Sequence, residues 1–209
     1  MSEKVCTKLA FCVDSVFSEG KGYGAIPCQD AKRREKCIVF LDTRSKPCCA
    51  EKGKSFTIQN TRNLLVLGIK LDGGVFIDAD FRKCDYMFVF QEKQKQKLED
   101  KEVVPERVVL IELKGKTAND LLSALEQLEN SLNNQYIREM IKPHRSFYGR
   151  VAGPSMTPNL PFSKSDDKAT RARILNLQKK LDKKFHDLRG NLKTGRALFT
   201  ERFDQMDRE

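Results

Sequence analysis

Three ionic side chains fall inside segments that are otherwise apolar. Glu112 and Lys114 follow the apolar run 108–111, and Asp85 opens a second apolar run that extends to residue 90. Because side chains alternate across a β-strand, Glu112 and Lys114 project to the same side of theirs. Burying such groups is costly unless something pairs with them. If the two strands are neighbours, the three side chains form a small anionic pocket with a cation at its rim.

The surrounding residues predict the elements that would position these side chains. Apolar, β-branched runs predict strands at 37–42, 55–59, 64–71, 84–90, 108–113 and 146–152. A capping box at Thr117 and Asp120 predicts the start of a helix whose leucine stripe faces the sheet. Another amphipathic helix is expected at 4–17, followed by a glycine-rich loop at 20–24. This order predicts an α/β fold with a mixed central sheet flanked by helices.

Proline spacing divides the chain into a domain and an extension. Residues 1–153 are expected to form one domain, and the proline-rich residues 154–162 a linker. Residues 163–209 are expected to form a C-terminal helical extension, because leucines recur at helical spacing among many lysines and arginines. This basic amphipathic tail could pack back on the domain, join two copies or a partner protein, or bind DNA. The sequence leaves these alternatives open.

The composition indicates a globular protein and favours a polyanionic partner. The chain has 209 residues, a formal net charge of +10 and 39% hydrophobic residues. A basic surplus of this size favours nucleic acid as a partner, although solvation alone can also explain it. No apolar run reaches the roughly 18 residues that span a bilayer, and no signal-like segment follows Met1. We therefore expect a cytoplasmic protein that does not bind membranes.

The cysteines and histidines give no metal-site pattern. The chain has seven cysteines, an odd number with no paired Cys-x-x-Cys spacing, so free thiols are expected. The four cysteines that could most readily suggest a zinc or iron–sulfur site are Cys28, Cys37, Cys48 and Cys49. They too are expected to be free thiols. The two histidines, His144 and His186, are too far apart to form a histidine-based zinc site. A serine-hydrolase site is excluded because the chain contains no Gly-x-Ser-x-Gly.

Basic residues gather around the last strand predicted before the linker. Lys142 and Arg145 flank His144, and Arg150 lies within the strand 146–152. Guanidinium and ammonium groups are the usual contacts to nucleic-acid phosphates. We expect Lys142, Arg145 and Arg150 to form a basic rim that contacts a DNA backbone.

The ionic residues and their order along the chain resemble the signature of the PD-(D/E)XK phosphodiesterase superfamily. The similarity is carried by Cys84-Asp85-Tyr86, by Leu110-Ile111-Glu112-Leu113-Lys114-Gly115, and by a following helix that contains Gln127. It covers about the central half of the chain. Cys84 replaces the proline of the signature, and the acid of the family's first core helix has no clear counterpart, with Asp14 and Glu19 as candidates only.

This resemblance implies a restriction-endonuclease-like fold and divalent-metal-dependent hydrolysis of DNA phosphodiester bonds. Asp85 and Glu112, with the Leu113 carbonyl, would hold Mg²⁺ or Mn²⁺, hard cations that prefer oxygen ligands. Lys114 would orient or deprotonate the attacking water, or stabilise the transition state. Gln127 would contact phosphate or water. Small proteins of this kind often serve in defence or mobile-element biology.

Two other interpretations remain open. The same fold could serve as a non-catalytic subunit that binds nucleic acid or another protein. The trio could also be a buried ion pair without catalysis, although such pairs often stabilise a fold no better than apolar residues do. A metal-dependent endonuclease is the function that the sequence favours.

Overall fold

The computed structural model describes ten stretches of the chain, which are 38–41, 48–51, 54–72, 82–91, 107–115, 117–134, 137–138, 146–152, 167–195 and 198–207. Several predictions lie outside these residues: the helix at 4–17, the loop at 20–24, the linker at 154–162, and the residues Asp14, Glu19, Cys28, Cys37, Lys142, His144 and Arg145.

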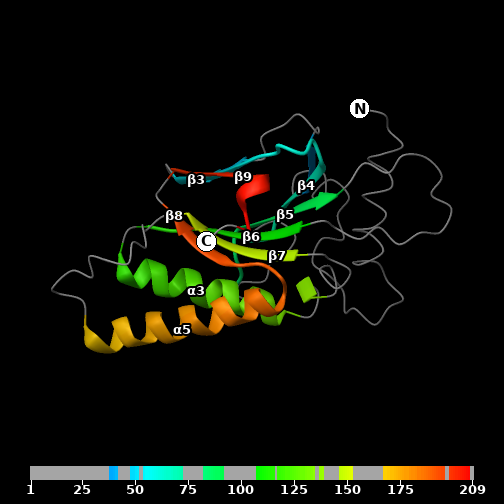
Figure 1. The fold of residues 1–209 in the computed structure, drawn as a ribbon. Coiled ribbons are helices and arrows are strands. Elements are labelled where there is room, and N and C mark those ends of the chain that lie inside the picture. Colours follow the sequence, from blue (N-terminus) through cyan, green and yellow to red (C-terminus); the bar gives the residue numbers. More distant parts are fainter. Residues whose placement is uncertain are drawn as a thin grey trace, which may run out of the picture.

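Two sheets and two long helices make up the described part of the chain (Figure 1). The strands are β1 (Ile38–Leu41), β2 (Cys48–Glu51), β3 (Lys54–Gln59), β4 (Leu65–Lys70), β5 (Tyr86–Gln91), β6 (Arg107–Leu113), β7 (Ser146–Ala152), β8 (Leu192–Gly195) and β9 (Leu198–Arg202). The helices are α3 (Ala118–Asn133), α5 (Lys168–Asp187) and the short 3-10 helix η1 (Phe203–Gln205).

The main sheet is mixed and has the order β1-β4-β5-β6-β7-β8. Its first four strands pair antiparallel, whereas β6, β7 and β8 run parallel. Parallel neighbours need a crossover connection, and α3 lies between β6 and β7 in the chain, as α5 lies between β7 and β8. The prediction of an α/β fold with a mixed sheet and helices packed on it is confirmed.

Helices α3 and α5 cover one face of the main sheet (Figure 1). The capping box predicted at Thr117 and Asp120 is present, and the leucines of the α3 stripe are buried. Ile174, Leu181 and Phe185 of α5 join the same core. A Cβ atom built on Gly149 of β7 would lie 2.4 Å from the Phe185 ring, so the absence of a side chain there lets α5 approach the sheet.

A second, three-stranded sheet with the order β2-β3-β9 covers the opposite face (Figure 1). Strand β6 is buried along its whole length and supplies both cores by alternation. Val108 and Leu110 pack towards the helices, while Val109 and Ile111 pack towards the second sheet. The described part of the molecule therefore has three layers, with β6 in the middle one.

The C-terminal segment differs from the predicted helical tail. Helix α5 is present and amphipathic, but β8 and β9 follow it. Strand β8 pairs with β7 in the main sheet, and β9 runs parallel to β3 in the second. Each strand is four or five residues long, too short to show a period of two against the charged residues around it. The segment thus completes both sheets.

Candidate functional site

The structure brings Asp85, Glu112 and Lys114 together at one end of β5 and β6. The Asp85 backbone N–H donates a hydrogen bond to Glu112 Oε2 over 3.1 Å. Asp85 Oδ2 accepts one from the Leu113 N–H over 2.7 Å, and Lys114 Nζ lies 2.9 Å from Glu112 Oε1. The three ionic side chains singled out in the sequence are therefore direct neighbours.

The register of the β5–β6 pair explains this meeting. Tyr86 pairs with Ile111 and Met87 with Leu110, so Asp85 lies opposite Glu112. Met87 and Leu110 face the helix layer, and side-chain alternation puts Asp85 and Glu112 on that same face. The backbone N–H groups of Leu71 and Asp72 both donate to the Asp85 carbonyl, at 2.8 and 3.4 Å. These bonds fix the Asp85 backbone before β5 begins.

The chain leaves β6 through Lys114 and Gly115 and turns into the first turn of α3. A Cβ atom built on Gly115 would lie 2.2 Å from Asp120 Oδ2, so a side chain at this position would push the Asp120 carboxylate out of the capping box. Hydrogen bonds from the hydroxyl and backbone N–H of Thr117 hold the pKa of Asp120 below its ordinary value, and Lys114 adds to this effect. The N-terminus of α3 therefore lies beside the site.

Burial dominates the electrostatics of Glu112. Its side chain has no exposed surface, and desolvation, followed by the charge of Asp85, raises the pKa of its carboxyl to about 8, against the opposing effect of Lys114. Burial, the largest single effect, tends to lower the pKa of Lys114. The charge and hydrogen bond of Glu112, together with the charges of Asp85 and Asp120, outweigh it, so this pKa lies above its ordinary value. The buried Glu112 carboxyl group is therefore stabilised either by a proton or by a positive charge placed beside it.

The donor set suits a hard divalent cation. Asp85 and Glu112 offer carboxylate oxygens from adjacent strands, and Mg²⁺ typically binds one or two carboxylates while keeping several waters. In the described part of the chain, no group of three or more His, Cys, Asp or Glu side chains could hold a metal ion. A zinc site, which takes three or four such protein ligands, does not fit these residues. The residues present fit Mg²⁺ or Mn²⁺.

Gln127 has a different contact from the one predicted. Its Nε2 donates to the Lys83 carbonyl over 2.9 Å, and its Oε1 accepts from the Ser123 hydroxyl over 3.3 Å. Both ends of the amide are therefore bonded within the protein. The side chain thus binds the backbone two residues before Asp85, and its contact with phosphate or water stays a prediction.

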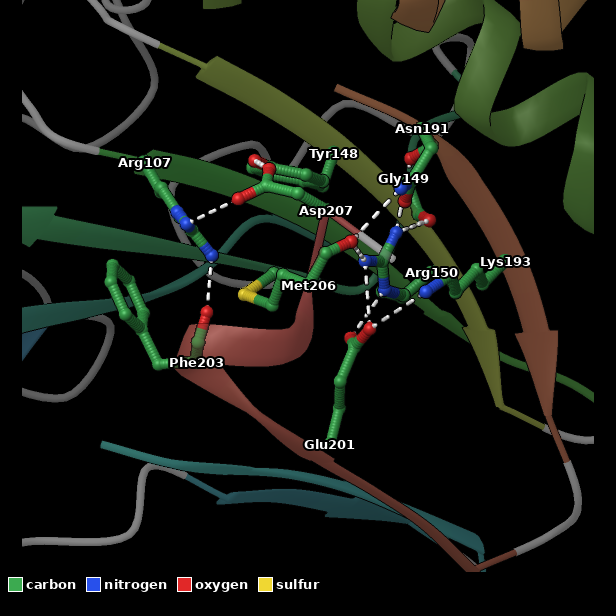
Figure 2. Close-up of polar contacts among 10 residues, drawn as sticks. All are labelled: Arg107, Tyr148, Gly149, Arg150, Asn191, Lys193, Glu201, Phe203, Met206 and Asp207. Atoms are coloured by element: carbon green, nitrogen blue, oxygen red, sulfur yellow. Dashed lines mark hydrogen bonds and ion pairs between the residues drawn. The ribbon is translucent and has the colours of Figure 1, made fainter. Parts of the chain in front are cut away.

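Arg150 does not belong to a basic rim. Its side chain is fully buried between the two sheets. Its register partner Ile111 faces the second sheet, so Arg150 points to the opposite side of the main sheet from Glu112. Its Nε and Nη2 donate to the two carboxylate oxygens of Glu201 at 2.6 and 3.0 Å (Figure 2). Two of its other bonds go to the carbonyls of Gly149 and Asn191. The predicted DNA contact of Arg150 is therefore wrong, since every donor group it would need is buried.

Lys83 is a buried neighbour of the site that the sequence does not indicate. This lysine lies two residues before Asp85, its side chain is only 2% exposed, and its Nζ lies 3.3 Å from Asp72 Oδ1. Arg82 and Lys83 look like a solvated turn in the sequence, and no local pattern marks the second of them as buried. Only the packing of α3 over this segment reveals it.

The thiols in the described residues agree with the prediction of free cysteines. Cys49 and Cys84 are both free and buried. Burial raises the pKa of the Cys84 thiol well above its ordinary value, which keeps it protonated and unreactive.

None of the described helices is long and apolar enough to cross a membrane.

No family model, no curated protein and no solved structure matches this chain. What can be inferred about function therefore comes from the geometry of Asp85, Glu112 and Lys114 and from the chemistry of their side chains.

Proposed function

We propose that this protein is a divalent-metal-dependent nuclease that hydrolyses phosphodiester bonds in DNA, with a fold of the restriction-endonuclease-like type. The observation that carries the proposal is the convergence of three ionic residues. Asp85 lies next to Glu112, and Lys114 Nζ lies 2.9 Å from Oε1 of the buried Glu112 carboxylate. The order β4, β5, β6, α3, β7 around this site is the order that the resemblance to the PD-(D/E)XK superfamily implies.

Each residue has a role that its position allows. Asp85 and Glu112 hold the cation with their carboxylates, and the Leu113 peptide, whose N–H is bonded to Asp85, offers its carbonyl as a third ligand. A divalent ion bound there would supply Lewis acidity and neutralise charge that develops on the phosphate. The Lys114 ammonium, a quarter exposed, donates hydrogen bonds that orient the attacking water and offset negative charge on the phosphate.

Charge balance supports a phosphate substrate. Two adjacent carboxylates repel a phosphodiester, so the substrate can bind only where a cation offsets them. Lys114 supplies one positive charge at the edge of the site, and the whole chain carries a formal surplus of +10. A basic protein attracts polyanions over long distances. DNA is therefore the substrate class that best fits both the site and the chain.

A second candidate is a non-catalytic subunit that binds nucleic acid. The observation in its favour is the contact between Lys114 Nζ and Glu112 Oε1, because an ion pair that offsets the carboxylate charge internally reduces the need for a metal ion. The two candidates differ in whether Mg²⁺ or Mn²⁺ displaces Lys114 from Glu112. This alternative predicts salt-sensitive DNA binding without cleavage.

Plasmid nicking tests the proposal. Purified protein with Mg²⁺ or Mn²⁺ is expected to convert supercoiled plasmid into nicked circles, and Glu112→Gln and Lys114→Ala are expected to abolish this while each variant still unfolds cooperatively. Lys179→Ala is the matched control, an exposed lysine of α5 that should leave cutting unchanged. Equal cutting by all variants would reject the assignment of the site. Binding without cutting under either metal would favour the non-catalytic subunit.

A further inference from the structure

Helix α3 carries a polar stripe on the side that faces the segment before Asp85. The stripe consists of Ser123, Gln127 and Ser131, which are four residues apart and therefore lie on one face of the helix. It runs beside the buried leucines of α3, and Ser131 itself has no exposed surface. A buried hydroxyl in a helix that otherwise faces an apolar core needs a hydrogen-bond partner.

Two members of this stripe bind consecutive backbone groups across the core. Gln127 Nε2 donates to the Lys83 carbonyl over 2.9 Å, and Ser131 Oγ accepts from the Cys84 N–H over 2.9 Å. Ser123 donates to Gln127 Oε1 over 3.3 Å, which turns the amide nitrogen of Gln127 towards Lys83. The stripe thus forms hydrogen bonds to the backbone of the two residues that directly precede Asp85.

This segment needs partners from outside the sheet. Strand β5 begins only at Tyr86, so Lys83 and Cys84 have no place in the strand ladder, yet both are buried. Buried backbone N–H and C=O groups are almost always bonded. A serine in the interior of a helix has a lower helix propensity than alanine, so the stability of α3 alone does not explain Ser131. Its contact with Cys84 does.

We propose that Gln127 and Ser131 are positioning residues of the candidate site, an inference that rests on the function proposed above. By fixing the Lys83–Cys84 backbone against α3, they set where Asp85 enters β5 and hold its carboxylate next to Glu112. Groups that orient metal ligands in this way affect metal affinity without touching the metal, and their loss costs about 10–100-fold. Gln127 and Ser131 therefore act through Asp85.

The test measures Mn²⁺ affinity of the full chain at pH 8 by electron paramagnetic resonance of free Mn²⁺. Ser131→Ala and Gln127→Met are each expected to weaken binding about tenfold. Ser131→Thr, which keeps the hydroxyl, is expected to bind within about twofold of the native chain, by the same reasoning. Ile174→Val is the control for a small loss of core packing on α5, and it should bind as the native chain does. Melting temperatures, recorded in parallel, identify any variant that fails to fold.

The outcomes separate the two proposals. If the native chain binds Mn²⁺ and both Ser131→Ala and Gln127→Met, folded, bind it equally well, the positioning role is overturned while the metal site stands. If the control Ile174→Val loses as much affinity as the two stripe variants, the effect is one of general packing and the role is again overturned. If the native chain does not bind Mn²⁺, the proposed function falls, and this inference falls with it.

Discussion

Asp85 and Glu112 lie opposite each other across two antiparallel strands, and the backbone N–H of the first donates to the carboxylate of the second over 3.1 Å. The Asp85 carboxylate in turn accepts the N–H of the residue that follows Glu112. These reciprocal bonds hold two acids together that would otherwise repel each other. Because Glu112 has no exposed surface, the pair responds strongly to protons and to cations, and this response can be measured.

The first prediction concerns stability against pH without a divalent metal. The pKa of Glu112 is raised from 4.5 to about 8 in the folded protein. Between these values the folded protein keeps a proton that the unfolded chain has lost, so the free energy of unfolding falls as pH rises. The slope from this one group is at most about 1.4 kcal/mol per pH unit.

Glu112→Gln removes this titration and should flatten the profile. The charged groups that face Glu112 are Asp85 and Lys114, and both remain in the variant. Urea unfolding of the native chain and of Glu112→Gln at pH 5.5, 7 and 8 provides the measurement. Parallel profiles for the two proteins would mean that Glu112 titrates normally and is better solvated than the structure indicates.

The second prediction concerns metal linkage. A proton on Glu112 competes with a cation for the same oxygens, so Mn²⁺ affinity should increase with pH up to about 8, the pKa of Glu112. At a free concentration of 100 times Kd the ion should stabilise the fold by about 2.7 kcal/mol. Asp85→Asn should abolish this shift in melting temperature, whereas Asp187→Asn, at the exposed end of α5, should keep it. A shift that survives in Asp85→Asn would place the ion elsewhere.

The side on which Glu112 and Lys114 project and the start of α3 could be predicted because both depend on local rules, whereas the meeting with Asp85 was expected only if the two strands were neighbours. The period of two puts Glu112 and Lys114 on one side of a strand, and an apolar strand beginning near Asp85 could be recognised from residues 84–90 alone. The capping box at Thr117 was equally local, since its partners lie within one helical turn. Each of these features is decided by residues close together in the sequence.

The role of Arg150 and the end of the chain could not be predicted, because both depend on distant partners. Glu201, the partner of Arg150, is 51 residues away in the sequence. A cation in a short apolar strand looks like a solvent-facing position when its partner cannot be seen. The serine that binds the Cys84 N–H is 47 residues further along the chain, and nothing near Cys84 indicates it.

The third prediction concerns the C-terminal segment. A chain cut after Ala152 should fail to unfold cooperatively, because it lacks the α5 residues Ile174, Leu181 and Phe185, which belong to the core on the helix side. It also lacks β8 and β9, one strand of each sheet. Near-ultraviolet circular dichroism and urea unfolding provide the measurement. A cooperative transition with native stability in the cut chain would mean that the segment is a separate tail.

The fourth prediction concerns the buried pair of Arg150 and Glu201 (Figure 2). Arg150→Met leaves the Glu201 carboxylate buried, with the Lys193 ammonium 3.5 Å away. Breaking a buried pair by removing one partner costs about 3–5 kcal/mol, whereas replacing both by apolar residues is often neutral. Urea unfolding should therefore show a large loss for Arg150→Met and substantial recovery in the double variant Arg150→Met/Glu201→Leu.

The double variant also separates this pair from DNA binding. Arg150 lies on the face of the main sheet opposite to Glu112 and is buried, so the folded double variant should bind DNA with the same salt dependence as the native chain. A lysine or arginine that contacts phosphate instead changes that salt slope by about one unit when it is removed. If the slope drops by one in the double variant while its stability is restored, Arg150 reaches DNA after all, and the two sheets must separate to expose it.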